Sequence, residues 1–93
     1  MTAAVEALYG TILDRQRSMP EGSYTAQLLR QGENEILKKI GEEAIEVLIA
    51  AKSEGDQRVV YEMADLVYHC LVLLAARGLA WSDIEAELEH RFR

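Results

Sequence analysis

Helix-breaking residues divide this chain at only a few points, which restricts it to long helices. One proline and six glycines occur in 93 residues. The breaks fall at residues 19–22, at Gly32, at residues 53–56 and at Gly78. No stretch between them alternates apolar and polar residues as a half-buried strand would. The sequence therefore predicts an all-α protein.

Five helices are expected between these breaks. They run from about 2 to 18, 23 to 31, 33 to 53, 56 to 77, and 82 to the end of the chain. Ser23 is placed to cap the second helix, and Ser82 with Glu85 has the spacing of a capping box in the last one. The two long central helices are expected to form an antiparallel hairpin. The predicted fold is a helical bundle in one domain, residues 1–93.

The composition predicts more apolar surface than one small subunit can bury. Apolar residues make up 49% of the chain. A chain of this length buries only about 60–65% of its unfolded surface, so a lone monomer would be marginally stable. We therefore expect a partner subunit that completes the bundle. The formal net charge of −6 disfavours nucleic acid as a partner and suits a protein that binds divalent cations.

The single cysteine, Cys70, excludes an intrachain disulfide and favours a reducing cytoplasm. It lies in an apolar run and is interpreted as a small core residue. The N-terminus lacks the basic and apolar segments of a signal peptide. The longest apolar run is much shorter than the roughly 20 residues that span a bilayer. We therefore expect no membrane association.

The third expected helix carries acidic residues in an unusual setting. Projection at about 100° per residue places Glu42, Glu43 and Glu46 between a broad apolar face and a narrower patch of Ile45 and Ile49. Acidic residues on a solvated helix face would not have apolar surface on both sides. These three are therefore candidates for a buried or half-buried site.

The fourth expected helix is apolar around most of its circumference, which is typical of a buried helix. Its one polar stripe consists of Arg58, Glu62, Asp65 and His69, at spacings of three and four residues. Buried carboxylates are unfavourable unless a cation or hydrogen bonds compensate them. The stripe therefore predicts a functional or ion-binding surface.

In an antiparallel hairpin the two acidic stripes can face each other. Glu43, Glu46, Glu62 and Asp65 would then converge, with Glu42 alongside. Like charges at close range raise each other's pKa values, and a hard divalent cation removes the conflict. Oxygen ligands without cysteine favour Mg²⁺, with Mn²⁺ as the alternative, over Zn²⁺. Because Mg²⁺ commonly bridges carboxylates to phosphates, we expect a substrate with a di- or triphosphate.

Acidic residues at these spacings also suit two other interpretations. Each acidic pair taken alone is a common pattern on a solvated helix face. A carboxylate di-iron site normally needs a Glu-x-x-His pair on two helices. His69 instead follows Asp65 by four residues and Glu62 by seven, so the di-iron pattern fails.

The acidic residues occur in a recognisable order. Residues 41–46, Gly-Glu-Glu-Ala-Ile-Glu, followed by residues 62–65, Glu-Met-Ala-Asp, resemble the E-E-x-x-E…E-x-x-D motif of the MazG-like all-α nucleotide pyrophosphohydrolases. Ser-Tyr-Thr-Ala at 23–26 and Lys-Lys-Ile-Gly-Glu-Glu at 38–43 narrow the resemblance to the phosphoribosyl-ATP pyrophosphohydrolases of histidine biosynthesis. The resemblance spans most of the chain.

The resemblance implies a reaction and an assembly. Phosphoribosyl-ATP and water would give phosphoribosyl-AMP and pyrophosphate, in a homodimer that pairs its central helices. A separate phosphoribosyl-AMP cyclohydrolase would take the product onward. Glu43, Glu46, Glu62 and Asp65 match the family's metal-binding acids. Glu42 is either an additional ligand or the base that orients the attacking water, and Glu46 is the other candidate for that base.

The remaining candidates are substrate contacts. They are Lys39, Lys38, Ser23, Tyr24, Thr25 and His69. Lys39 lies on the acidic stripe, and residues 23–25 form a helix N-terminus, where phosphate or ribose can bind. The lysines could also be solvated, Ser23 could act only as a cap, and Tyr24 could fill the core. His69 is counted here although a lone helical histidine among apolar residues is more often a hydrogen-bonded core residue.

Two other functions remain open on the sequence alone. The acidic stripes fit equally well a housecleaning enzyme of the same superfamily that acts on dUTP or damaged nucleoside triphosphates. A small acidic helical dimer could also be a non-enzymatic adaptor that binds Mg²⁺ only for structure.

Overall fold

The computed structural model describes residues 3–92, and these contain helices and no strand. The helices are α1 (Ala3–Ser18), α2 (Tyr24–Gln31), α3 (Glu33–Ser53), α4 (Asp56–Ala76) and α5 (Trp81–Arg91). The all-α prediction is confirmed, and the two central helices end within one residue of the expected positions. The expected start of the first helix at Thr2 lies outside the described residues.

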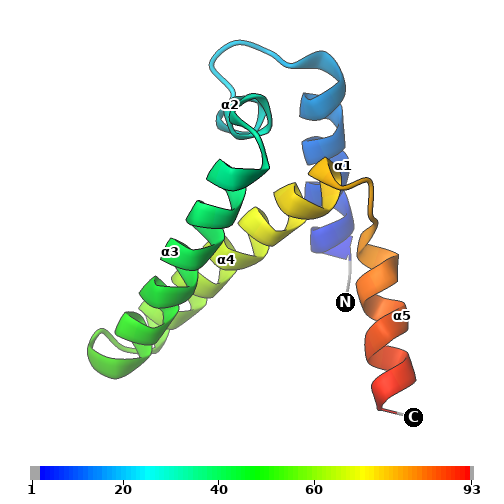
Figure 1. Ribbon diagram of the computed structural model, residues 1–93. Coiled ribbons are helices and arrows are strands. Elements are labelled where there is room, and N and C mark those ends of the chain that lie inside the picture. Colours follow the sequence, from blue (N-terminus) through cyan, green and yellow to red (C-terminus); the bar gives the residue numbers. More distant parts are fainter. Residues whose placement is uncertain (1–2, 93) are drawn as a thin grey trace.

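The α3–α4 hairpin forms the axis of the molecule (Figure 1). α3 and α4 run antiparallel and pack against each other more extensively than any other pair of helices. α1 and α2 both pack against α4, and α2 also contacts α1 and α3. α5 packs against α1, its first turn contacts the core, and its C-terminal part projects away from the hairpin. The end of the hairpin that carries the α3–α4 connection is therefore not covered by the other helices (Figure 1).

The core lies where the end of α4 meets α1, α2 and the start of α3. Its fully buried large side chains are Ile12, Leu28, Ile36, Leu71 and Val72. Burying each such side chain contributes about 1.5–3 kcal/mol. The other end of the hairpin has no such cover: Leu48 and Val60 are 68% and 70% exposed. One half of the hairpin is therefore buried and the other half is apolar but uncovered.

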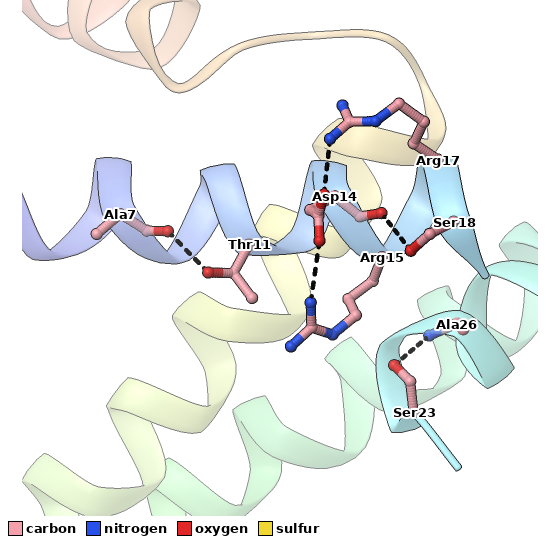
Figure 2. A network of polar contacts seen from close by, with 8 residues as sticks. All are labelled: Ala7, Thr11, Asp14, Arg15, Arg17, Ser18, Ser23 and Ala26. Atoms are coloured by element: carbon pink, nitrogen blue, oxygen red, sulfur yellow. Dashed lines mark hydrogen bonds and ion pairs between the residues drawn. The ribbon is translucent and has the colours of Figure 1, made fainter. Parts of the chain in front are cut away.

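Local hydrogen bonds mark the end of α1 and the start of α2 (Figure 2). The Ser23 hydroxyl accepts a hydrogen bond from the Ala26 backbone N–H at 3.1 Å, so the predicted cap is confirmed. Gly32 follows α2 with φ 102°, a left-handed conformation that favours glycine. Near the end of α1, the Ser18 hydroxyl donates to the Asp14 carbonyl at 2.9 Å. Residues 19–23 therefore form a defined turn between two helices.

The start of α5 differs from the expected one. The helix begins at Trp81, not Ser82, and the Asp83 carboxylate accepts the Ala80 backbone N–H at 2.8 Å. Trp81 packs against the core, and this contact draws the helix start one residue earlier. Ser82 therefore lies inside the first turn, and the predicted capping box with Glu85 is wrong.

Within residues 3–92, α4 alone is long and apolar enough to cross a membrane, with a mean hydropathy of 1.6 in its most apolar window. The same helix carries Glu62 and Asp65, and its end forms part of the core. Core helices satisfy the same length and composition test. Cys70 on this helix is half-buried rather than fully buried, so it lies at the edge of the core.

Candidate active site

Three acidic side chains meet where the middle of α3 crosses α4. Carboxylate oxygens of Glu43, Glu62 and Asp65 all lie within 4.8 Å of one another. Glu43 and Glu62 are buried, and Asp65 is half-buried. We call these residues the acid cluster. Within residues 3–92 this is the one group of acidic, histidine or cysteine side chains close enough to share a metal ion.

The carboxylates of the acid cluster are in electrostatic conflict. Burial raises the pKa of Glu43, and a hydrogen bond to Asp65 and the charge of Asp65 raise it further. The charge of Lys39, and that of His69 whenever its ring is protonated, act in the opposite direction but are the smaller effects. Glu43 therefore resists ionisation in the fold without an added cation.

Two basic side chains lie beside the acid cluster. An Arg58 guanidinium N–H donates to the Glu62 carboxylate at 2.6 Å, one helical turn away. The Lys39 ammonium lies 3.4 Å from the Glu42 carboxylate and 3.7 Å from that of Glu43. Burial lowers the pKa of Lys39, but Tyr24 and these carboxylates outweigh burial and raise it overall. Lys39 therefore stays charged at the edge of the cluster.

The structure does not bring Glu42 and Glu46 into the acid cluster. Both are exposed on α3. Glu46 is not among the side chains that lie close enough to share an ion with Glu43. Glu42 instead pairs with Lys39. Three of the four predicted metal-binding acids thus meet, and the two candidate bases lie outside them.

The start of α2 lies against the same part of α4. The Tyr24 hydroxyl is 2.9 Å from His69 Nε2, and the Thr25 hydroxyl is hydrogen-bonded to the Tyr68 hydroxyl. Tyr24 remains 46% exposed. Ser23 is used as the α2 cap, as described above. The structure therefore places Tyr24, unlike Ser23, with both a buried partner and a surface open to ligand.

His69 is 2% exposed and its two ring nitrogens both have partners. Nδ1 lies 2.8 Å from the Asp65 carbonyl oxygen, and Nε2 faces Tyr24. Any contact with substrate would therefore pass through Tyr24. Of the two lysines predicted to bind substrate, Lys39 is half-buried beside the acid cluster, whereas Lys38 is exposed.

Two features of the site were not identified from the sequence. Arg58 was placed on the polar stripe without a role, although its position four residues before Glu62 indicates an ion pair. Tyr68 was not identified at all, because its partner Thr25 is 43 residues away in the sequence. A hollow lined by Tyr68, Asp65 and the side chains of residues 60, 61 and 64 adjoins the acid cluster.

The chain is similar over nearly its whole length to proteins of one enzyme family. Residues 5–92 match the family model described as phosphoribosyl-ATP pyrophosphohydrolase. The phosphoribosyl-ATP pyrophosphatase of Pelotomaculum thermopropionicum is 63% identical over 87 residues, which cover 94% of this chain and 89% of that protein. The phosphoribosyl-ATP pyrophosphatase of Metallosphaera sedula is 50% identical over 100% of this chain and 100% of its own length. That of Trichlorobacter lovleyi is 51% identical over 95% of this chain and 82% of its own length.

Proposed function

The chain belongs to the phosphoribosyl-ATP pyrophosphohydrolase family, and on this basis we propose that it hydrolyses phosphoribosyl-ATP to phosphoribosyl-AMP and pyrophosphate. The resemblance inferred from the motifs is thereby confirmed, as is the assignment to the hydrolases of histidine biosynthesis. In the structure, the acid cluster supports this function. It lies beside the charged Lys39 and near the partly exposed Tyr24.

The acid cluster fits a divalent cation. It offers three carboxylates and no sulfur or free imidazole nitrogen, which suits Mg²⁺ or Mn²⁺. The raised pKa of Glu43, caused first by burial and then by Asp65, indicates a carboxylate whose charge its neighbours do not fully compensate. We propose that Glu43, Glu62 and Asp65 hold Mg²⁺. When bound, such an ion polarises the phosphoryl oxygens, lowers the pKa of a coordinated water and offsets the charge of the leaving pyrophosphate.

The remaining residues of the site would position substrate and water. Lys39 can contact a phosphate oxygen, because its ammonium lies at the edge of the acid cluster. Water attacks a phosphorus atom of the anhydride between the α and β phosphates. The P–O bond that joins the α phosphate to the β phosphate breaks, and pyrophosphate leaves. We propose that Glu42 or Glu46 accepts the proton of this water. Both are exposed carboxylates on the helix that carries Glu43.

We also propose a homodimer that covers the exposed half of the hairpin. Leu48 and Val60, with Ile45, Tyr61 and Met63, leave large apolar side chains open on α3 and α4. Several large apolar side chains exposed on the same two helices are typical of a protein interface. Sedimentation or light scattering at several concentrations would measure the molar mass. A mass of one chain at all concentrations would contradict the dimer.

Other expectations stay predictions. We propose a cytoplasmic location, consistent with the free thiol of Cys70, whose pKa burial raises. Neither nucleic acid nor a membrane is proposed as a partner, given the net charge of −6. Coupling to a separate phosphoribosyl-AMP cyclohydrolase would follow from the product that this enzyme releases.

The test is pyrophosphate release from phosphoribosyl-ATP with Mg²⁺ and then with EDTA, with ATP and dUTP as controls. We expect Mg²⁺-dependent release from phosphoribosyl-ATP alone. Release from dUTP or ATP instead would indicate a housecleaning enzyme with the same fold and site. No release from any of the three would favour the non-enzymatic adaptor.

A further inference from the structure

Two neighbouring side-chain pairs connect α2 to α4 next to the acid cluster. Tyr24 pairs with His69, and Thr25 pairs with Tyr68. The rings pack as well: Tyr68 and His69 meet edge to face at 4.9 Å between centroids, and Tyr24 stacks on Tyr68 at 6.2 Å. We call these four residues the α2–α4 seam. The packing holds Tyr24 in one orientation relative to α4.

The partners of His69 determine its tautomer. Nδ1 lies 2.8 Å from the Asp65 backbone carbonyl oxygen, which has no proton to give. Nδ1 therefore carries the ring proton and donates it to that oxygen. In the neutral imidazole the other nitrogen, Nε2, is then an acceptor. The group that it accepts from is the Tyr24 hydroxyl, 2.9 Å away.

This arrangement fixes what the Tyr24 oxygen can do. Burial raises the pKa of Tyr24 and outweighs the opposing charge of Lys39, so the hydroxyl keeps its proton at neutral pH. That proton points inward, to His69. The lone pairs of the oxygen stay free to accept a further hydrogen bond, and the residue as a whole is 46% exposed. Towards a ligand, Tyr24 is therefore an acceptor and not a donor.

We propose that the Tyr24 hydroxyl accepts a hydrogen bond from a hydroxyl or amino group of the nucleotide. His69 is the positioning residue, because it accepts the hydrogen bond that the Tyr24 hydroxyl donates and so keeps that proton from the ligand. This inference rests on the proposed function. An ionised phosphate oxygen has no proton to donate, so Tyr24 would contact the ribose or the base. Phosphate contacts then fall to Lys39 and to the ion held by the acid cluster.

Two substitutions of His69 test the roles of its two ring nitrogens one at a time. His69→Gln places an amide oxygen near the position of Nε2 and keeps an acceptor for Tyr24. His69→Asn places its amide near Nδ1 and keeps only the contact to the Asp65 carbonyl. Tyr24→Phe removes the hydroxyl itself. Tyr9→Phe is the matched control, because it removes a tyrosine hydroxyl that is bonded to the Leu79 carbonyl and takes no part in the seam.

Steady-state kinetics with phosphoribosyl-ATP and Mg²⁺ would test the proposal. Loss of one hydrogen bond is expected to raise KM roughly five- to tenfold in Tyr24→Phe and His69→Asn, with kcat within about twofold. His69→Gln should recover most of the wild-type KM. The double variant of Tyr24→Phe with His69→Asn should be no worse than Tyr24→Phe alone, because both remove the same interaction.

Substrate analogues would identify the donor. A deoxyribose analogue removes a ribose hydroxyl, and an analogue with oxygen in place of the adenine amino group removes the amine. The analogue that lacks the true donor should raise KM for the wild type but not for Tyr24→Phe. The proposal is overturned if Tyr24→Phe leaves KM unchanged, or if both analogues affect the wild type and Tyr24→Phe equally.

The controls separate this proposal from the proposed function and from misfolding. If the wild-type chain fails to hydrolyse phosphoribosyl-ATP, the proposed function itself is wrong. If the wild type is active and His69→Gln and His69→Asn have equal KM values, only the role of His69 is wrong. Circular dichroism would establish that the His69 variants fold, and Tyr24→Phe tests the acceptor role without altering a fully buried residue.

Discussion

The acid cluster and the α2–α4 seam lie side by side on α4 and meet at Asp65, yet they are built in opposite ways. In the cluster, like charges face one another, and Lys39 stays 3.7 Å from Glu43. In the seam, neutral side chains pair with each other, and both nitrogens of His69 are satisfied. The carboxylate of Asp65 belongs to the first region and its backbone carbonyl to the second.

The difference shows which region stabilises the fold and which one is available for chemistry. A satisfied buried hydrogen bond contributes about 1 kcal/mol to stability. A buried carboxylate without compensation lowers stability until a cation binds. The seam therefore holds the helices in place, and the cluster gains its favourable interactions from a ligand. Substitutions in the two regions should affect different measurements.

The largest effect is expected from removing the charges of two cluster residues. In Glu62→Gln with Asp65→Asn, pyrophosphate release should fall about a thousandfold, since a metal site contributes several kcal/mol to catalysis. The fold should persist, because repulsion is relieved. Pyrophosphate release and circular dichroism would measure the two consequences.

The matched control for this double variant is Glu6→Gln with Glu21→Gln, which removes the same charge from exposed positions outside the site. Its activity should equal that of the wild type. If the cluster variant kept full activity, the acid cluster would not be the metal site. If it unfolded, the cluster would serve the structure instead.

The second expected effect concerns metal removal. With Mg²⁺ at about a hundredfold excess over its Kd, the wild type should gain roughly 2.7 kcal/mol in free energy of unfolding relative to EDTA. The cluster variant should gain nothing. Tyr68→Phe, altered only in the seam, should keep the whole gain. Urea unfolding with and without EDTA would measure this gain in free energy of unfolding. An equal gain in all three proteins would mean that Mg²⁺ does not bind at the acid cluster.

The third effect belongs to the seam. Thr25→Val and Tyr68→Phe should each lower the free energy of unfolding by about 1 kcal/mol, because each leaves the other partner's polar atom unpaired. The double variant should lose less than the sum of the two. Tyr68→Phe should leave kcat unchanged. Additive losses in urea unfolding would show that Thr25 and Tyr68 do not act as a pair.

The sequence was informative where structure depends on local periodicity. The hairpin and the convergence of Glu43, Glu62 and Asp65 follow from helical spacing, because residues three and four apart share a face. The seam could not be predicted in this way, since Tyr24 and His69 lie 45 residues apart and meet only through the packing of α2 on α4. The same limit explains Glu46, whose direction relative to α4 depends on the exact rotation of α3.

Errors at the helix ends have a similar cause. Ser82 and Glu85 had the spacing of a capping box, but packing of Trp81 moved the start of α5 by one residue. Ser23, by contrast, caps α2 as expected, because its hydrogen bond is made to a residue three positions along. Local hydrogen bonding was thus predicted correctly where tertiary contacts did not displace it.

The smallest expected effect is the pH dependence that Glu43 gives to the metal-free protein. Burial and Asp65 raise its pKa in the folded state, so the fold binds this proton more tightly than the unfolded chain does. Stability should therefore fall as the pH rises from the ordinary range of a glutamate carboxyl through the raised pKa, and stay low above it. Glu43→Gln lacks this group and should lose that part of the slope.

Urea unfolding in EDTA across this pH range would measure the slope for both proteins. At neutral pH without metal, Glu43→Gln should be the more stable of the two. With Mg²⁺ the order should reverse, because only the wild type keeps all three carboxylates of the acid cluster. Glu21→Gln, at an exposed position, should follow the wild type throughout. If the wild type and Glu43→Gln gave parallel pH curves, burial and Asp65 would not destabilise the charged form of Glu43. The contrast between the acid cluster and the seam would then rest on Glu62 and Asp65 alone.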